Sequence, residues 1–431
     1  MSASTQRLNY SQIPPRASSS RAIRNEIVPT NSGGNYTMNS QIIFDLPANL
    51  NNTFCDFQSS YIKMKITNND ATNFNFHGGG MPSAIKQIVL ELGGQTLFSC
   101  DNWGTLYEMM ISLDTSDSFK DNAGQRLFGA GSGFEGAEVA AAASRTVCFP
   151  LVLTPLINSR YFPLIGRDRL RIRLILDTAA KGLISATTGV LDSEVVISDV
   201  ALVTYNLELG SDVMSMVAAN SGGAFKIAMP SYQHHQASLS NTATSLVATL
   251  GFSMSSLNRV LIAQQLQAVT DTRNSVGNRS RLRLNRFFIT IGGVKYPMRD
   301  VQDLGTTGDA GAGSEPFAEA LISQRALCAW SHDSSVAGGT GGGGFSLQEG
   351  SGAAVGTTGS FLIDLDLESQ RVSGGESSVG LVAGVNCIGQ VVQLTMEYAA
   401  SATADHVVNV YGEHTILCSL DLNTLTWSIA V

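Results

Sequence analysis

The chain has little charge, few histidines and none of the short motifs that mark common catalytic sites. No lysine follows a glycine, which excludes a phosphate-binding loop of the Walker type. No serine has glycine both two residues before and two residues after it, which excludes the nucleophile elbow of hydrolases. Zinc-type spacings of cysteine and histidine are also missing. These absences predict a protein that is not an enzyme and needs no cofactor or metal.

Segments that direct a protein into a membrane are missing as well. No run of 18 apolar residues occurs, so we expect no transmembrane helix. The first seven residues lack an apolar core, so we expect no secretory signal. Cysteines are few, contain no Cys-x-x-Cys pair and mostly lie in apolar segments, so we interpret them as reduced, buried residues of a protein made inside a cell. They are Cys55, Cys100, Cys148, Cys328, Cys387 and Cys418.

Three short patterns resemble sites, and each has a plainer explanation. Ser83 and Lys86 satisfy a Ser-x-x-Lys pattern that is common by chance. Ser331-His332-Asp333 joins three residue types of a catalytic triad, but triads are assembled in space rather than along the chain. His234-His235 is a candidate metal pair, but two solvated loop histidines are the plainer explanation.

An internal duplication is the strongest positive feature. A strand-like run ends in a double glycine at residues 93–94, and the same arrangement returns at residues 292–293. Gly93 and Gly292 are 199 residues apart, and an earlier strand pair, Ile62 and Leu261, keeps that offset. The duplication predicts two copies of one β-rich domain.

The order of the following elements is also repeated. Apolar residues at helical spacing predict a helix over residues 102–113, capped by Asp101 or Asn102, and a second helix is expected over residues 315–324. Each copy continues through a loop rich in glycine, alanine and serine into three strands. These strands are expected at 146–154, 170–176 and 195–209, and at 361–367, 391–398 and 407–418.

Composition agrees with two β-domains. A chain of 431 residues is too long for one core, and many short strands with 43 glycines between them are typical of sandwich or barrel domains. We predict an N-terminal arm at 1–38, a first domain at 39–210, a linker at 211–232 and a second domain at 233–431. Charged residues make up only 14%, as expected for a subunit whose faces contact its neighbours.

Two charged stripes stand out on predicted strands. Because side chains alternate along a strand, three arginines share one face of the run 169–174, and three carboxylates align in the same way further on. Each stripe is either a solvated or salt-bridged strand face, or a contact to other subunits or to nucleic acid. We expect the arginines to face carboxylates of the same or a neighbouring subunit, with the acidic stripe as candidate partner. The stripes are Arg169, Arg171 and Arg173, and Asp364, Asp366 and Glu368; a further arginine cluster is Arg273, Arg279, Arg281, Arg283 and Arg286.

The N-terminal arm is basic, with Arg7, Arg16, Arg21 and Arg24 against the single acid Glu26. Its composition cannot bury a core, so we expect it to be ordered only by other molecules. The net charge of −8 argues against a broad nucleic-acid-binding surface and leaves the arm as a local one.

Three segments then resemble a known family. They are residues 148–151 (CFPL), 161–165 (YFPLI) and 170–174 (LRIRL), which follow a strand, a Gly-Gly turn, a helix and a long loop. Together with the strand near Ile197–Leu202, this order is similar to that of the double jelly-roll major capsid proteins of the PRD1/adenovirus-like lineage. The resemblance covers residues 39–431 and rests on pattern rather than on one diagnostic string.

The resemblance implies an all-β fold of two tandem eight-stranded jelly-roll sandwiches with a short helix in each. It implies a homotrimeric, pseudo-hexameric capsomer in the icosahedral shell of a virion, mostly of DNA viruses, with the polinton-like or virophage-like branch as one candidate. Partners would be further copies, penton and minor capsid proteins, and an inner membrane or the genome at the arm. The alternative is a tandem β-sandwich that binds carbohydrate or a receptor, since jelly rolls serve many functions; a metal-dependent enzyme of cupin type would need clustered histidines, which the sequence does not offer.

Overall fold

The computed structural model describes residues 20–31, 34–131, 135–157, 161–185, 190–268, 276–282, 284–302, 314–323, 361–368, 384–402 and 404–430. Arg7 and Arg16, the Ser331-His332-Asp333 pattern, Cys328, Arg273 and Arg283 lie outside these residues. Within them, no helix is long and apolar enough to span a membrane.

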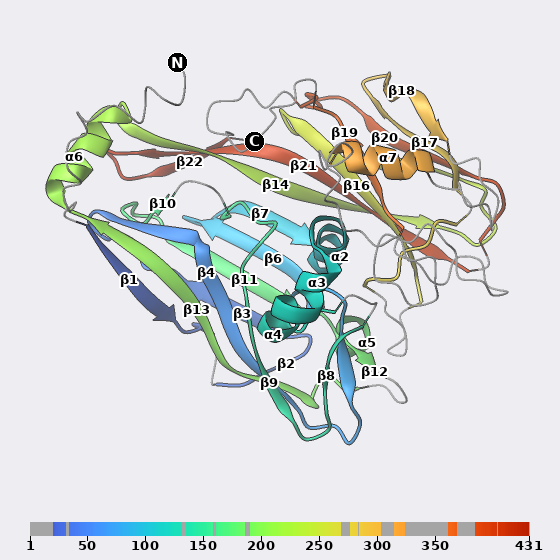
Figure 1. Ribbon diagram of the computed structural model, residues 1–431. Helices are drawn as coiled ribbons and strands as arrows, with labels where there is room; N and C mark the ends of the chain where they lie inside the picture. The colour runs from blue at the N-terminus through green and yellow to red at the C-terminus, as the bar shows by residue number, and fades with distance from the viewer. Residues whose placement is uncertain are drawn as a thin grey trace, which may run out of the picture.

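The first half of the chain forms three antiparallel sheets (Figure 1). Its strands are Ser20–Ile27 (β1), Tyr36–Thr37 (β2), Gln41–Asp45 (β3), Thr53–Asn68 (β4), Phe74–His77 (β5), Ile85–Leu92 (β6), Gln95–Asp101 (β7), Glu135–Val139 (β8), Ser144–Phe149 (β9), Phe162–Pro163 (β10), Leu170–Leu176 (β11), Ile184–Ser185 (β12) and Val195–Leu209 (β13). One sheet has the order β1-β13-β4-β10, with β2 and β9 beside it; the second has the order β3-β11-β6-β7; the small third is β12-β5-β8.

The second half forms two further antiparallel sheets. Its strands are Ala224–Leu239 (β14), Ser245–Leu250 (β15), Leu257–Leu266 (β16), Leu284–Ile291 (β17), Val294–Gln302 (β18), Ile363–Asp366 (β19), Val392–Tyr398 (β20), His406–Asp421 (β21) and Trp427–Ala430 (β22). The sheet orders are β14-β21-β16-β19, with β22 beside β21, and β15-β20-β17-β18. Each half thus contains two four-stranded sheet paths, which is the strand complement of an eight-stranded jelly roll.

The two halves repeat one topology, as the duplication predicts. The turn Gly93-Gly94 joins β6 to β7, and Gly292-Gly293 joins β17 to β18, which hold the same two places in their sheets. The backbone φ angles also agree, at 60° and 83° in the first turn and 58° and 86° in the second. Two consecutive residues in the left-handed region form the tight hairpin turn that glycine accommodates without strain.

Burial follows the period of each element. Along β11, four apolar residues point inward and the arginines between them point outward. The buried apolar residues of both halves form one continuous cluster. The strand predicted at 146–154 ends earlier, at Phe149. The bounds predicted for β11 and β13 agree with the structure.

The helices are Met81–Ala84 (η1), Trp103–Asp114 (α2), Asp117–Phe119 (α3), Lys120–Gly124 (η2), Gln125–Phe128 (α4), Ala179–Gly182 (α5), Ser211–Asn220 (α6) and Ser314–Ser323 (α7). Helix α2 matches the predicted helix, but residues 103–112 are buried on every face because the helix lies between the two rolls (Figure 1). Asn102 occupies its N-cap position with φ 49° and makes no capping hydrogen bond with its side chain.

Two expected segment boundaries are wrong. Residues 20–27 of the expected arm form β1, which pairs with β13 over its whole length and is therefore part of the first roll. The expected linker contains the helix α6, and its last residues lie in β14, which pairs with β21 from Ala224 to Leu239. The division of the chain into two domains near residues 211–232 stays a prediction. The strands are divided in the same region, because β1–β13 form three sheets and β14–β22 form two others.

Candidate subunit-contact surfaces

The arginine stripe of β11 lies on the outer face of the β3-β11-β6-β7 sheet. Arg171 donates two hydrogen bonds to Asp45 on β3, from Nε to Oδ1 at 2.7 Å and from Nη2 to Oδ2 at 3.3 Å. Arg173 pairs with Glu91 on β6. The hydrogen bond to Asp45 raises the pKa of Arg171 above its ordinary value. Arg169 lines a hollow of about 260 Å³ beside Asp45, Glu91 and the Gly93-Gly94 turn.

The acidic stripe is not the partner of these arginines. Asp364 is fully buried, accepts a hydrogen bond from Ser323 Oγ at 2.7 Å and lies 3.6 Å from Arg259. Asp366 Oδ1 accepts a hydrogen bond from the backbone N–H of Glu368 at 2.9 Å. Within this chain, Arg171 and Arg173 pair with carboxylates of β3 and β6 instead of the acidic stripe, because partners in a sheet are set by strand neighbours and β11 has β3 and β6 beside it. A subunit contact through either stripe stays a prediction, and Asp364 as it stands is enclosed by its own chain.

The second roll carries its own ion-pair cluster on the corresponding sheet. Arg286 of β17 donates to both carboxylate oxygens of Glu397, at 2.8 and 2.7 Å, and lies 3.1 Å from Asp300. Lys295 pairs with Asp300 and lies over the ring of Phe288, 4.0 Å from its centre. Paired charges of this kind keep an outer face polar with little net charge.

The other described arginines of the cluster predicted near residues 273–286 are not on the surface. Arg279 is 1% and Arg281 is 5% exposed. Arg279 donates to the carbonyl of Phe361 at 3.3 Å and to Ser112 Oγ, on helix α2, at 3.2 Å. Removal from water lowers the pKa of Arg279 to about 10. This guanidinium therefore joins the two rolls internally.

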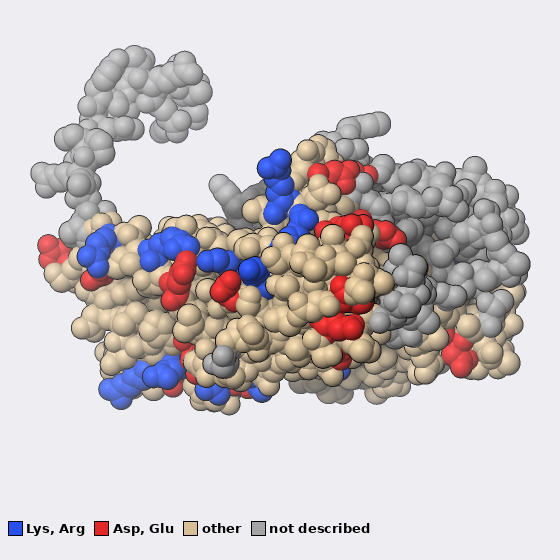
Figure 2. All heavy atoms as spheres, turned by 90° about the horizontal axis from the view of Figure 1, so that it is seen from below, with Lys and Arg blue, Asp and Glu red and all other residues tan. Residues whose placement is uncertain are grey.

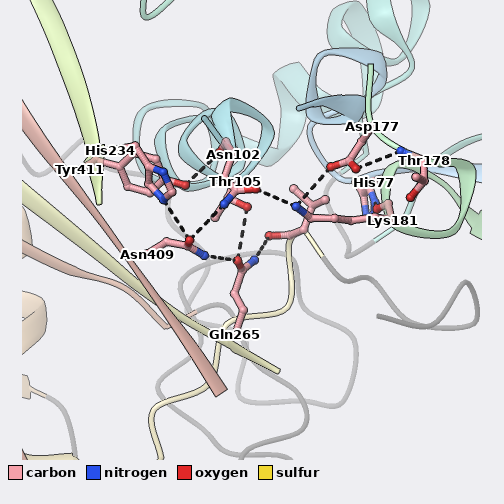
Figure 3. A network of polar contacts seen from close by, with 11 residues as sticks. His77, Asn102, Thr105, Asp177, Thr178, Lys181, His234, Gln265, Asn409 and Tyr411 are labelled. Atoms are coloured by element: carbon pink, nitrogen blue, oxygen red, sulfur yellow. Dashed lines mark hydrogen bonds and ion pairs between the residues drawn. The ribbon is translucent and has the colours of Figure 1, made fainter. Parts of the chain in front are cut away.

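A second set of polar contacts, buried or half-buried, joins the rolls (Figure 3). Asn409 of β21 accepts from Asn102 at 3.2 Å and donates to Gln265 of β16 at 2.8 Å. Lys181 of α5 donates to Asn102 at 2.8 Å and pairs with Asp177 at 3.2 Å. Side chains of the first roll thus form hydrogen bonds with side chains of the second roll.

His234 belongs to this network, which argues for a structural role. Its Nε2 lies 3.0 Å from Asn409 Oδ1, an oxygen that only accepts, so Nε2 carries the proton. Its ring packs against Tyr411, with centres 4.8 Å apart. Burial lowers the pKa of His234 below its ordinary value. Among the described residues, no group of three or more potential metal ligands occurs, and the pair His234-His235 does not form one.

Strand β1, in the described part of the arm, is held by its pairing with β13 and carries two ion pairs at the surface. Arg21 lies 3.4 Å from Glu208 of β13, and Arg24 lies 2.8 Å from Glu26. In the face seen in Figure 2, the described surface is mostly uncharged; its basic side chains lie towards the left and centre with some acidic ones among them, and the charged side chains towards the right are acidic.

The two rolls with equivalent sheets form a double jelly-roll, as the resemblance implied. No protein-family model matches the sequence, and no curated protein matches it.

Solved structures that resemble the chain are major capsid proteins with this fold. The capsid protein in the PBCV-1 virus capsid matches 98% of this chain and 99% of its own length, with TM-score 0.61 and 11% identity. The Faustovirus major capsid protein matches 95% of this chain and 92% of its own length, with TM-score 0.59 and 10% identity. The mavirus major capsid protein matches 98% of this chain and 92% of its own length, with TM-score 0.54 and 11% identity. At these identities the likeness shows a shared fold.

Proposed function

We propose that the protein is the major capsid subunit of an icosahedral virion. The observation that carries the proposal is the repeated strand order over nearly the whole chain, which the capsid protein of PBCV-1 shares over 99% of its own length. Two like rolls in one chain give a trimer six similar lobes, so a threefold assembly fills a hexagonal place in a shell. Its role is structural, not enzymatic.

The proposed partners are first of all further copies of the chain. The low charge content of 14% supports large side faces that are covered in the assembly. We expect a homotrimer whose interfaces exceed the roughly 1,600 Å² of a standard interface. Penton and minor capsid proteins are proposed as further partners, and the basic N-terminal arm is proposed to lie at the inner face, near a membrane or the genome.

The experiment is to express the chain alone, measure its mass by light scattering and view it by negative-stain electron microscopy. We expect a mass three times that of the 45.6 kDa chain and particles with a hexagonal outline. A monomer that persists at micromolar concentration and forms no larger particles contradicts the proposal.

A further inference from the structure

An apolar groove of about 620 Å³ lies at the end of the molecule where α6 connects the rolls. Leu207 and Leu209, at the end of β13, form one side, and Val213 and Val217 of α6 form another. Phe54 and Phe225, from different rolls, meet in it with ring centres 5.8 Å apart. The groove is therefore made jointly by the first roll, α6 and β14.

The helix over this groove is not covered by the described part of the chain. None of the side chains of α6 is buried there, and Val217 is 36% exposed. Tyr161, which also lines the groove, is 51% exposed. Because most helices in proteins are stabilised by burying an apolar face, a ten-residue helix with none buried indicates a further contact.

The chain itself supplies a segment of the right chemistry at the right place. Ser20, where β1 begins, pairs with Leu209, so the residues before Ser20 start at the wall of the groove. Residues 8–15 read LNYSQIPP and contain three apolar or aromatic residues followed by two prolines. The four residues between Pro15 and Ser20 span up to about 18 Å when extended, which is enough to let the segment turn back.

Aromatic-lined grooves bind proline-containing segments well. Such segments are already extended, so little conformational entropy is lost on docking. This groove offers Phe54, Tyr161 and Phe225 as aromatic walls. We propose that residues 8–15 of the same chain occupy the groove and cover the apolar face of α6, with Arg7 and Arg16 left at its two ends. The inference concerns the isolated subunit and does not depend on shell formation.

Limited trypsin digestion of the purified full-length protein tests the proposal. Docking slows cleavage after Arg16, because a protease needs an extended, accessible chain. Val217→Asp places a charge in the groove and should raise the initial rate of cleavage after Arg16 about tenfold, as the open population rises. Met216→Asp is the matched control: this neighbour is 66% exposed, does not line the groove, and should leave the rate unchanged. Equal rates in the wild type and in Val217→Asp overturn the proposal.

A cross-link identifies the occupant. The double variant Ile13→Cys/Val217→Cys should form a disulfide within one chain on mild oxidation, and neither single variant should. A linked dimer on a non-reducing gel means that a second copy supplies the segment, which overturns docking in the same chain. If no cross-link forms and the native mass spectrum shows a retained lipid, then a lipid fills the groove. That result also overturns docking of residues 8–15.

Discussion

The charges that matter most to this fold are the few that the core encloses. Asp364 is fully buried and lies 3.6 Å from Arg259, which also binds Glu413 at 2.7 Å. Ion pairs at the surface, such as Arg24 with Glu26, stay in contact with water. The same pair of residue types therefore contributes differently to stability according to its surroundings.

Replacing Asp364 with alanine should lower the free energy of unfolding by about 1–3 kcal/mol, because Ser323 and Arg259 lose a buried acceptor while Arg259 keeps Glu413 as a partner. Urea denaturation measures the change. Glu26→Ala, which breaks an exposed pair, is the control and should leave the midpoint unmoved. A midpoint for Asp364→Ala equal to that of the wild type would falsify this account of the buried pair.

The double-glycine turns give a second prediction for single residues. Gly293 has φ 86°, and no atom lies within 4 Å of the position that a Cβ would take there, so any cost of alanine is conformational. We expect Gly293→Ala to lower the free energy of unfolding by about 1–2 kcal/mol. Gly251→Ala is the control, since that glycine also has open space and no positive φ. Thermal unfolding of both variants checks the difference, and equal melting temperatures contradict it.

At the scale of elements, the alternation of apolar and polar residues predicted some strands correctly. Strand β11 ends where the pattern predicts, because it buries one face continuously, and β13 also ends there although register shifts interrupt its alternation. β1 was missed because it is an edge strand with no buried residue, and α6 was missed because it buries none either. An element without a buried face leaves no periodic signal in the sequence.

The partners of the arginine stripe could not be read in the same way. Asp45 and Glu91 lie on β3 and β6, far from Arg171 in the sequence, and are brought opposite it only by strand register. Alternation predicts the face of a strand and says nothing about its neighbours. The aligned carboxylates near Asp364 were the more visible sequence feature, but β19 belongs to another sheet.

The packing of β14 and β21 predicts a dependence of stability on pH. Burial lowers the pKa of His234 on β14 and of His414 on β21 below the ordinary value of 6.5. The unfolded chain therefore binds more protons than the folded one below about pH 6.5, and stability falls as the pH decreases from there.

Denaturation curves between pH 5 and pH 8 check this expectation. The variant His234→Gln/His414→Gln, which keeps polar side chains without a titratable ring, should show a shallower loss of stability on acidification than the wild type. His235→Gln, which changes the neighbouring ring outside the network, is the control. Equal slopes in all three proteins rule out these two histidines as the source.

For the whole molecule, the position of β1 changes what a truncation should do. Deleting residues 2–19 leaves every described strand in place, so the protein should remain folded and associate as before, with weakened shell assembly. Deleting residues 2–30 also removes β1 and opens the edge of β13 along eight paired residues. We expect the longer deletion to aggregate. Circular dichroism and size-exclusion chromatography of both proteins test this, and a soluble, folded 2–30 deletion contradicts it.

The pairing of β14 with β21 has a consequence for how the chain reaches this structure. The paired residues lie between 167 positions apart, for Leu239 and His406, and 197 positions apart, for Ala224 and Asp421. Contacts so distant in sequence form slowly, because the intervening chain must close a long loop first. All described strands of the first roll have left the ribosome once Leu209 has emerged, so that roll can fold during translation. β14 cannot pair with β21 until most of the remaining chain has been synthesised. Trp427, near the far end, then stacks on Phe162 with ring centres 5.0 Å apart and attaches the late-folding roll to the early one.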